Sequence, residues 1–255
     1  MTGGLLLMKS LVEKDLKVRY KRSFLGFLWF LLKPLFSMVV YTIVFTKIIR
    51  FGGAIEHFSL FLLTGLLPWN FFAASLSASA KTLLDNQKLI RSIYFPRVAL
   101  PISSVIANAV HMLMAMVVLE GLLIAFGHIP GISIITLPIA IVLLAAMTSG
   151  FAMMISVGNV YYRDVSQFLE VILLAWFYAS PVIYPLGAGL IPARMEAVIK
   201  FNPVAGAMEI FHSTMYYGTW PELWAWISLV AWTAVILVAG LLIFKRMEPS
   251  VVKEL

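Results

Sequence analysis

The sequence predicts an all-α integral membrane protein with six transmembrane helices. Of its 255 residues, 62% are hydrophobic and only 12% are charged, whereas soluble domains carry about 25% charged residues. Roughly 20 consecutive apolar residues cross a bilayer core. Six such segments occur, at residues 24–46, 58–80, 98–126, 132–157, 168–184 and 223–244. We expect them to form a single transmembrane domain over residues 1–255.

The positive charges predict which side of the membrane each loop faces. Lys and Arg are enriched in cytoplasmic loops, and the six spans would leave only Lys47, Arg50, Arg194 and Lys200 on the opposite side. Both termini are therefore expected in the cytoplasm. The net charge of +7 then describes a basic rim against anionic lipid and does not indicate nucleic-acid binding. Without cysteine, disulfides and thiolate metal sites are excluded.

Residues 1–23 are expected to form an interfacial helix on the inner membrane surface. Between residues 5 and 20 apolar side chains recur at helical spacing, while Lys9, Glu13 and Lys17 occupy another face. An ordinary tail is the alternative. In either case a basic amphipathic segment, and not a cleavable signal sequence, would precede the first span.

The sequence "NQKLIRSIYFPR", at 86–97, lies between the second and third spans. On a helix Leu89 aligns with Ile93, and Ile90 with Tyr94, which gives one apolar face, while Pro96 would end the helix. We expect a short cytoplasmic helix lying across the ends of both spans, so that a protein bound to it could tilt both. The alternative is a loop that only obeys the positive-inside rule.

The loops farther along the chain differ in length. The sequence "FGHIPG", at 126–131, predicts a tight external hairpin, and residues 158–167 form a cytoplasmic connection. Residues 185–222 are rich in Pro and Gly, and they predict two short helices at the external mouth, around 193–200 and 205–217. The last span, with its basic end, extends to residue 247 and leaves a cytoplasmic tail over 248–255.

Catalytic and metal-binding motifs are not apparent. "GGLLLMKS", at 3–10, resembles a phosphate loop, but Met8 replaces the second glycine, which the backbone needs to curl around phosphate. The four histidines are far apart in sequence, so we interpret them as structural. Glu120 and Glu170 are the candidates for an intramembrane proton relay, but neither has an obvious acidic partner. We therefore expect no catalytic residue, metal site or cofactor in this chain.

Four blocks of sequence resemble one known family. They are "EKDLKVRYKRSFLGFLWFLLKPL" (13–35), "DNQKLIRSIYFPRVALP" (85–101), "YRDVSQFLEVILLAWFYASPVIYP" (162–185) and "FNPVAGAMEIF" (201–211). In this order they resemble the transmembrane permease subunit of ABC exporters for cell-surface polysaccharides, which carry lipid-linked O-antigen, capsule or teichoic acid. The resemblance implies a multi-pass subunit in the bacterial inner membrane, paired with a second copy of itself and with two ATP-binding cassette subunits that bind ATP and Mg²⁺.

The resemblance also implies roles for particular residues. The segment after the second span would be the coupling helix that docks onto the ATPase, through Lys88, Leu89, Ile90, Arg91, Ile93, Tyr94, Phe95 and Arg97. The channel would lie between two copies and be lined by the first and fifth spans. Aromatic side chains there would serve as platforms for sugar rings: Phe27, Trp29, Phe30, Tyr41, Phe168, Trp176, Tyr178 and Tyr184. Packing or interfacial anchoring is the alternative for each ring.

The lipid end of the substrate calls for positive charge at the inner leaflet. Arg19, Lys21 and Arg22, with Tyr20 beside them, directly precede the first span and would receive an anionic pyrophosphate head group; plain topology determination explains them equally well. The predicted function is export of lipid-linked, O-antigen-like polysaccharide. The alternatives are export of teichoic acid or of small hydrophobic drugs, and less favourably a secondary transporter, which would show more intramembrane charges and inverted repeats. A membrane enzyme would need clustered Asp, His or Arg.

Overall fold

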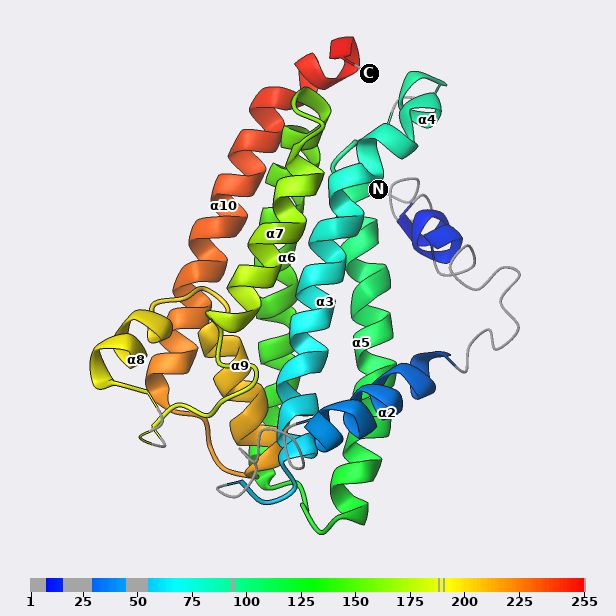
Figure 1. The fold of residues 1–255 in the computed structure, drawn as a ribbon. Coiled ribbons are helices and arrows are strands. Elements are labelled where there is room, and N and C mark those ends of the chain that lie inside the picture. The colour runs from blue at the N-terminus through cyan, green and yellow to red at the C-terminus, as the bar shows by residue number, and fades with distance from the viewer. Residues whose placement is uncertain are drawn as a thin grey trace.

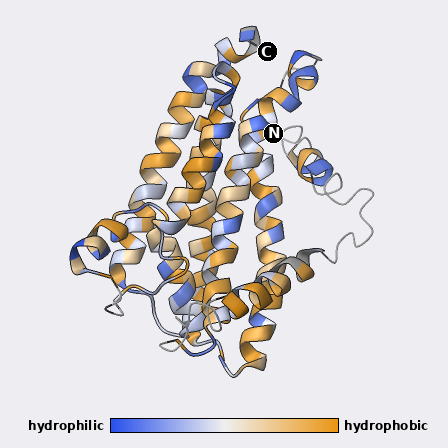
Figure 2. Ribbon diagram, viewed as in Figure 1, coloured by the Kyte–Doolittle hydropathy of each residue, from blue (hydrophilic) through white to orange (hydrophobic). Residues whose placement is uncertain are grey.

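The computed structural model describes residues 8–15, 29–44, 55–92, 95–187, 189 and 191–254. Within these ranges the chain is helical with turns and contains no strand, which confirms the all-α prediction. The helices form an elongated bundle (Figure 1). Hydrophobic residues predominate along most of the length of the long helices (Figure 2), and many large hydrophobic side chains are exposed, as expected for a protein surrounded by lipid.

Within the described ranges, four helices are long and apolar enough to cross a membrane. They are α3 (Phe58–Asp85), α5 (Ala99–Ala125), α6 (Leu137–Tyr161), which follows the 3-10 turn η4 (Ile132–Thr136), and α10 (Leu223–Glu254). They correspond to the second, third, fourth and sixth predicted spans. α10 continues beyond residue 247 and through Pro249 to Glu254. The residues that were predicted to form a tail are therefore part of the last helix.

Two further apolar helices are shorter. α2 (Trp29–Thr42) and α7 (Val165–Tyr178) have 14 residues each. At 1.5 Å per residue each is about 21 Å long, which is less than the roughly 30 Å of a hydrocarbon core. α2 crosses the bundle at a steep angle to α3 and α5 (Figure 1). The prediction of six spans therefore stays a prediction, because the ends of the segment around α2 lie outside the described residues.

α3 is the central helix of the bundle. In the most apolar stretch of α3, 78% of the residues are buried, compared with 22% in the corresponding stretch of α10. Much of α10 therefore faces lipid. Phe61, Leu62, Phe72 and Leu76 on α3 are completely buried in a core shared with α5, α6, α7 and α9 (Ala205–Phe211). α3 therefore contacts α2, α5, α6, α7 and α9, whereas α10 packs mainly against α6 and α9.

Glycines set how closely some helices approach. Gly65 on α3 faces the segment after α7 and the π-helical turn η5 (His212–Tyr216). A Cβ atom added at Gly65 would lie 2.7 Å from His212 Nε2 and 2.8 Å from the Val182 carbonyl oxygen. Small residues at such positions allow close packing between membrane helices. No larger side chain fits at Gly65 without moving η5.

We predict that Gly65→Val destabilises the protein by about 1–3 kcal/mol, which is the usual cost of overpacking. Thermal unfolding in detergent would measure this as a lower melting temperature. The matched control is Gly121→Val on α5, where an added Cβ meets nothing within 4 Å. Equal melting temperatures for the two variants would show that the contact between α3 and η5 is not tight.

The connections that were predicted to be external meet at one end of the bundle. The hairpin after α5 reaches η5 through His128, whose Nδ1 lies 3.2 Å from the Tyr216 carbonyl oxygen, and reaches the start of α3 through His57 Nδ1, 3.3 Å from His128 Nε2. α8 (Ala193–Lys200) and α9 lie toward this same end (Figure 1). The two short helices predicted between the fifth and sixth spans are present.

Candidate functional site

One candidate region lies at the end of the bundle opposite α8 and α9. There α4 (Gln87–Ser92), a short helix at residues 8–15 and the last turns of α10 come together (Figure 1). They share a hydrophobic cluster, here called the end cluster, which contains Leu11, Leu83, Ile90, Phe95, Ala99, Leu100, Met153, Val157, Val160, Phe244 and Val251. The predicted interfacial and coupling segments are thus joined to the ends of the long helices.

The structure separates the predicted coupling residues by burial. Leu89 and Arg97 are half-buried, and Leu89 packs against the end cluster. Ile90 and Phe95 are buried in the end cluster, with 4% and 8% of their surface exposed, and they attach α4 to the bundle. Lys88 and Arg91 are exposed and are free to contact another protein. Ile93 and Tyr94 lie outside the described residues.

Polar contacts also tie this end together. Lys14 Nζ donates a hydrogen bond to Asn86 Oδ1 at 2.9 Å, just before α4. Ser104 Oγ donates to Asp15 Oδ2 at 3.4 Å. Arg97 Nη1 lies 3.7 Å from Glu248 Oε1 of α10. Segments from the beginning, middle and end of the sequence are therefore connected to the turn that carries α4.

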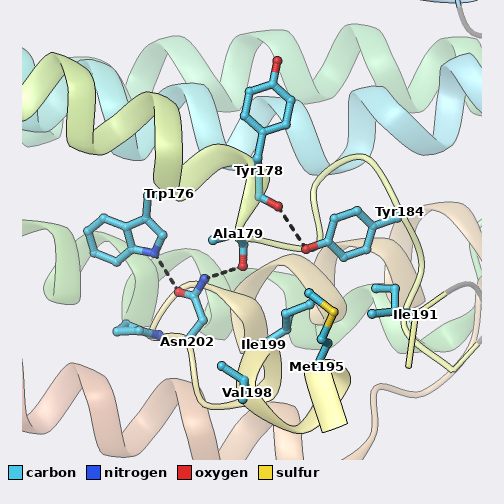
Figure 3. Close-up of a pocket in the computed structure, with 10 residues that line it drawn as sticks. Trp176, Tyr178, Ala179, Tyr184, Ile191, Met195, Val198, Ile199 and Asn202 are labelled. Carbon is cyan, nitrogen blue, oxygen red and sulfur yellow. Dashed lines mark hydrogen bonds between the residues drawn. The ribbon is translucent and has the colours of Figure 1, made fainter. Parts of the chain in front are cut away.

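The second candidate region is a pocket near the end that was predicted to be external, here called the external pocket. It has a volume of about 670 Å³ and lies between the end of α7, the following loop and α8. Figure 3 shows its lining residues: Trp176, Tyr178, Ala179, Tyr184, Ile191, Met195, Val198, Ile199, Asn202 and Pro203. This volume falls within the range of small-molecule sites in proteins, and none of the lining side chains is charged.

Asn202 holds the pocket together. Its Oδ1 accepts hydrogen bonds from Trp176 Nε1 at 2.8 Å and from the Val204 backbone N–H at 3.1 Å. Its Nδ2 donates to the Ala179 carbonyl oxygen at 3.1 Å (Figure 3) and to Ser180 Oγ at 2.9 Å. One side chain thereby fixes the end of α7 against the turn that leads into α9.

Asn202 also explains a difference from the predicted fifth span. The span was expected over 168–184, but α7 ends at Tyr178. Pro181 has no backbone N–H for a helical bond, and Asn202 binds the carbonyl oxygen of Ala179 in place of the next turn. Sequence reasoning used Asn202 only as part of a helix break. The signal that could have found it is the tendency of Asn to hydrogen-bond its own backbone two residues on.

Of the eight predicted aromatic path residues, Trp176, Tyr178 and Tyr184 line this pocket. Tyr178 does so beside Tyr184 with its backbone, because its ring points away from the other lining residues (Figure 3). Tyr184 donates a hydrogen bond from its hydroxyl to the Tyr178 carbonyl oxygen at 3.2 Å. Three others lie outside the pocket: Phe168 is 67% exposed near the start of α7, and Trp29 and Tyr41 are half-buried on α2. Phe30 is described only as part of the α2 backbone, and Phe27 lies outside the described residues.

The predicted head-group residues Arg19, Tyr20, Lys21 and Arg22 also lie outside the described residues. Of the two carboxylates considered for a proton relay, Glu170 is exposed on α7, and the Glu120 carboxylate on α5 has no hydrogen-bond partner among the described residues. Among the described residues, neither carboxylate has the polar partner that a proton relay needs.

Two of the four histidines are brought together in a way the sequence did not suggest. His57 and His128 approach each other although 71 positions separate them. His212 is buried and stacks on Phe61, with 4.0 Å between ring centroids, and burial lowers its pKa to about 3, so its ring stays neutral at physiological pH. No group of three or more potential metal ligands occurs in the described part of the chain.

Comparison with known proteins gives a family and several relatives. The sequence profile of the family described as "ABC-2 type transporter" matches residues 7–216. The chain is 31% identical over 239 residues to the O-antigen export system permease protein RfbA of Myxococcus xanthus, covering 94% of this chain and 91% of that protein. It is equally identical over 244 residues to a protein of the same name from Klebsiella pneumoniae, covering 95% and 92%.

A more distant relative is the polysialic acid transport protein KpsM of Escherichia coli. It is 23% identical to this chain over 248 residues, with 95% of this chain and 94% of that protein covered. These matches run along nearly the whole length of both partners, so they include the end cluster as well as the external pocket.

Proposed function

The chain belongs to the ABC-2 type transporter membrane family, and from that premise we propose that it is the permease of an ATP-driven exporter of lipid-linked polysaccharide. The observation that carries this proposal is its 31% identity, over more than nine-tenths of both chains, to two O-antigen export permeases. The permease itself is non-catalytic. The substrate moves from the cytoplasmic to the external side of the inner membrane, and ATP with Mg²⁺ is bound by a separate ATPase subunit.

The transmission of force begins at α4. The exposed charges of Lys88 and Arg91 contact the ATPase, and the buried Ile90 and Phe95 anchor α4 to the bundle. Because protein interiors are close-packed and transmit strain, a push on α4 reaches the ends of α3 and α5. A complete exporter contains two copies of the chain and two ATPase subunits.

The sugar path runs along α7 and ends near the external pocket. α7 buries only Leu169 and Leu173, and its exposed side includes Phe168, Val171, Ile172, Leu174 and Tyr178. A second copy of the chain would face this side across the channel. The pocket offers aromatic rings with a few polar edges and no charge, which suits the apolar faces and hydroxyls of a neutral sugar ring. On the inner side, Arg19, Tyr20, Lys21 and Arg22 receive the anionic lipid head group.

Replacing Tyr184, which lines the pocket, together with Tyr178, on the exposed side of α7, tests the sugar path. We assign each ring about the 0.5–1.5 kcal/mol that an aromatic pair contributes. Because 1.4 kcal/mol corresponds to tenfold, we expect Tyr178→Ala combined with Tyr184→Ala to lower export about tenfold. Trp176 is left intact because it holds Asn202. The control is Tyr162→Ala with Trp220→Ala, two exposed aromatic residues outside the pocket. Equal export by both double variants would reject the pocket as part of the path.

The proposed subunit composition is tested by capture from the native membrane. The chain, solubilised in mild detergent, is expected to carry a P-loop ATPase in equal amount, and lipid-linked polysaccharide is expected to stimulate its ATP hydrolysis. Stimulation by small hydrophobic drugs instead would favour a drug exporter. Recovery of the chain alone, together with transport in vesicles without ATP, would favour a secondary transporter.

A further inference from the structure

We propose that α10 is a coupling element that links the α4 end of the protein to the external pocket, with the ion pair between Arg97 and Glu248 as its positioning contact. The proposal rests on the proposed function, because it concerns how ATPase movement at α4 reaches the substrate path. It adds a role for the last helix, which does not line the pocket.

The first step is the attachment of α10 to the α4 turn. Arg97 follows directly after Pro96, between α4 and α5, and its guanidinium lies 3.7 Å from the Glu248 carboxylate. The two side chains are only 20% and 30% exposed. Phe244 and Val251, on either side of Glu248 in the sequence, are buried in the end cluster with Ile90. α10 is therefore fixed to the α4 region by a charged contact and by apolar packing.

α10 is also stiff enough to transmit a movement from one end of the bundle to the other. It is one helix of 32 residues, about 48 Å at 1.5 Å per residue, and it runs the length of the bundle (Figure 1). Midway, Gly240 lies against the backbone of Gly150 on α6, and Gly150 lies against the Ile236 carbonyl oxygen, so that an added Cβ at either glycine would overlap the facing backbone. Backbone contact of this kind holds α6 and α10 together as one body.

The third step is the contact between α10 and the pocket. Trp232 Nε1 donates a hydrogen bond to the Phe201 carbonyl oxygen at 3.1 Å, and the two rings pack edge to face. Phe201 directly precedes Asn202, which organises the pocket. An added Cβ at Gly206 on α9 would lie 2.5 Å from the Ala225 carbonyl oxygen of α10. A shift of α10 therefore reaches the turn at 201–206 and, through Asn202, the end of α7.

These contacts predict that breaking the ion pair uncouples ATP hydrolysis from export. Partly exposed ion pairs contribute little to stability, so Arg97→Glu and Glu248→Arg should fold. In proteoliposomes that contain the permease and its ATPase, we expect each single charge reversal to lower the polysaccharide exported per ATP hydrolysed at least about threefold. The double variant, in which the charges are exchanged, should return to within about twofold of the original ratio.

The control is Lys245→Glu, an exposed charge reversal on the same helix, one turn before Glu248. Its ratio of export to ATP hydrolysis should be unchanged. Trp232→Phe is a second variant, which removes the N–H donor at the pocket end but keeps an aromatic ring, and it should also lower the ratio. Unchanged ratios in the single variants, or a double variant no better than either single, would overturn the proposal.

A failure of the α10 proposal can be distinguished from a failure of the proposed function. If no ATPase associates with the unaltered chain, or if export needs no ATP, the exporter proposal itself is wrong. If the unaltered complex is ATP-driven but exchange of the charges does not restore coupling, only the role of α10 is wrong.

Discussion

Reversing both exposed charges of α4, by Lys88→Glu together with Arg91→Glu, is expected to abolish export while the chain remains folded. Both side chains point away from the bundle, whereas Ile90 and Phe95 hold α4 in place. Like charges brought together at an interface suppress association strongly. We therefore expect loss of the ATPase from the detergent-solubilised complex and an unchanged melting temperature of the permease.

The matched control is Arg163→Glu with Lys245→Glu. These two residues are also exposed and basic, they carry the same charge change, and they lie outside α4. The control should keep the ATPase bound. If both double variants lose the ATPase equally, net charge, and not the surface of α4, governs the association. If neither loses it, α4 is not the docking element.

Asn202→Leu is expected to collapse the external pocket and reduce export to near the background level. Leucine has a similar size but cannot bind Trp176 Nε1, the Ala179 carbonyl oxygen or Ser180 Oγ, and each such hydrogen bond contributes about 0.5–1.5 kcal/mol to stability. The end of α7 should then separate from the turn before α9. Limited proteolysis would detect this as faster cleavage between residues 179 and 204.

A suitable comparison for this variant is Gln167→Leu, which also replaces an amide by leucine but at an exposed position on α7. It should leave both export and cleavage unchanged. Normal export by Asn202→Leu would mean that the pocket is not needed for transport, whatever its effect on stability.

The long helices could be predicted from the sequence because length and apolar content determine which segments cross a bilayer. α3, α5 and α6 begin within a few residues of the predicted spans, and the turn at 126–131 has the residues that favour turns. Their ends were less predictable. α7 stops at Tyr178 because Asn202, 23 positions after Ala179, binds the Ala179 carbonyl oxygen, and α10 continues through Pro249 while Val251 is buried in the end cluster.

In the candidate sites, too, local sequence patterns predicted short segments but not the contacts between residues that are far apart in the sequence. The amphipathic pattern at 86–97 and the resemblance to polysaccharide exporters identified the α4 region and placed Ile90, but not Arg91, on an apolar face. The sequence could not identify the distant residues, such as Phe244 and Val251, that share a cluster with Ile90. Among the aromatic residues, only the fold shows that Trp176, Tyr178 and Tyr184 share one pocket. The contact between Gly150 and Gly240 could not be predicted, because small residues indicate close packing without identifying the partner helix.

The most direct measurement of the proposed function is the location of lipid-linked polysaccharide in cells that lack this chain. We predict that the polysaccharide is still synthesised, is absent from the cell surface, and is accessible only from the cytoplasmic side of inner-membrane vesicles. Expression of the chain should restore surface display, and the variant with Lys88→Glu and Arg91→Glu should not. Unchanged surface display without the chain, or a failure to synthesise the polysaccharide at all, would contradict the assignment as an export permease.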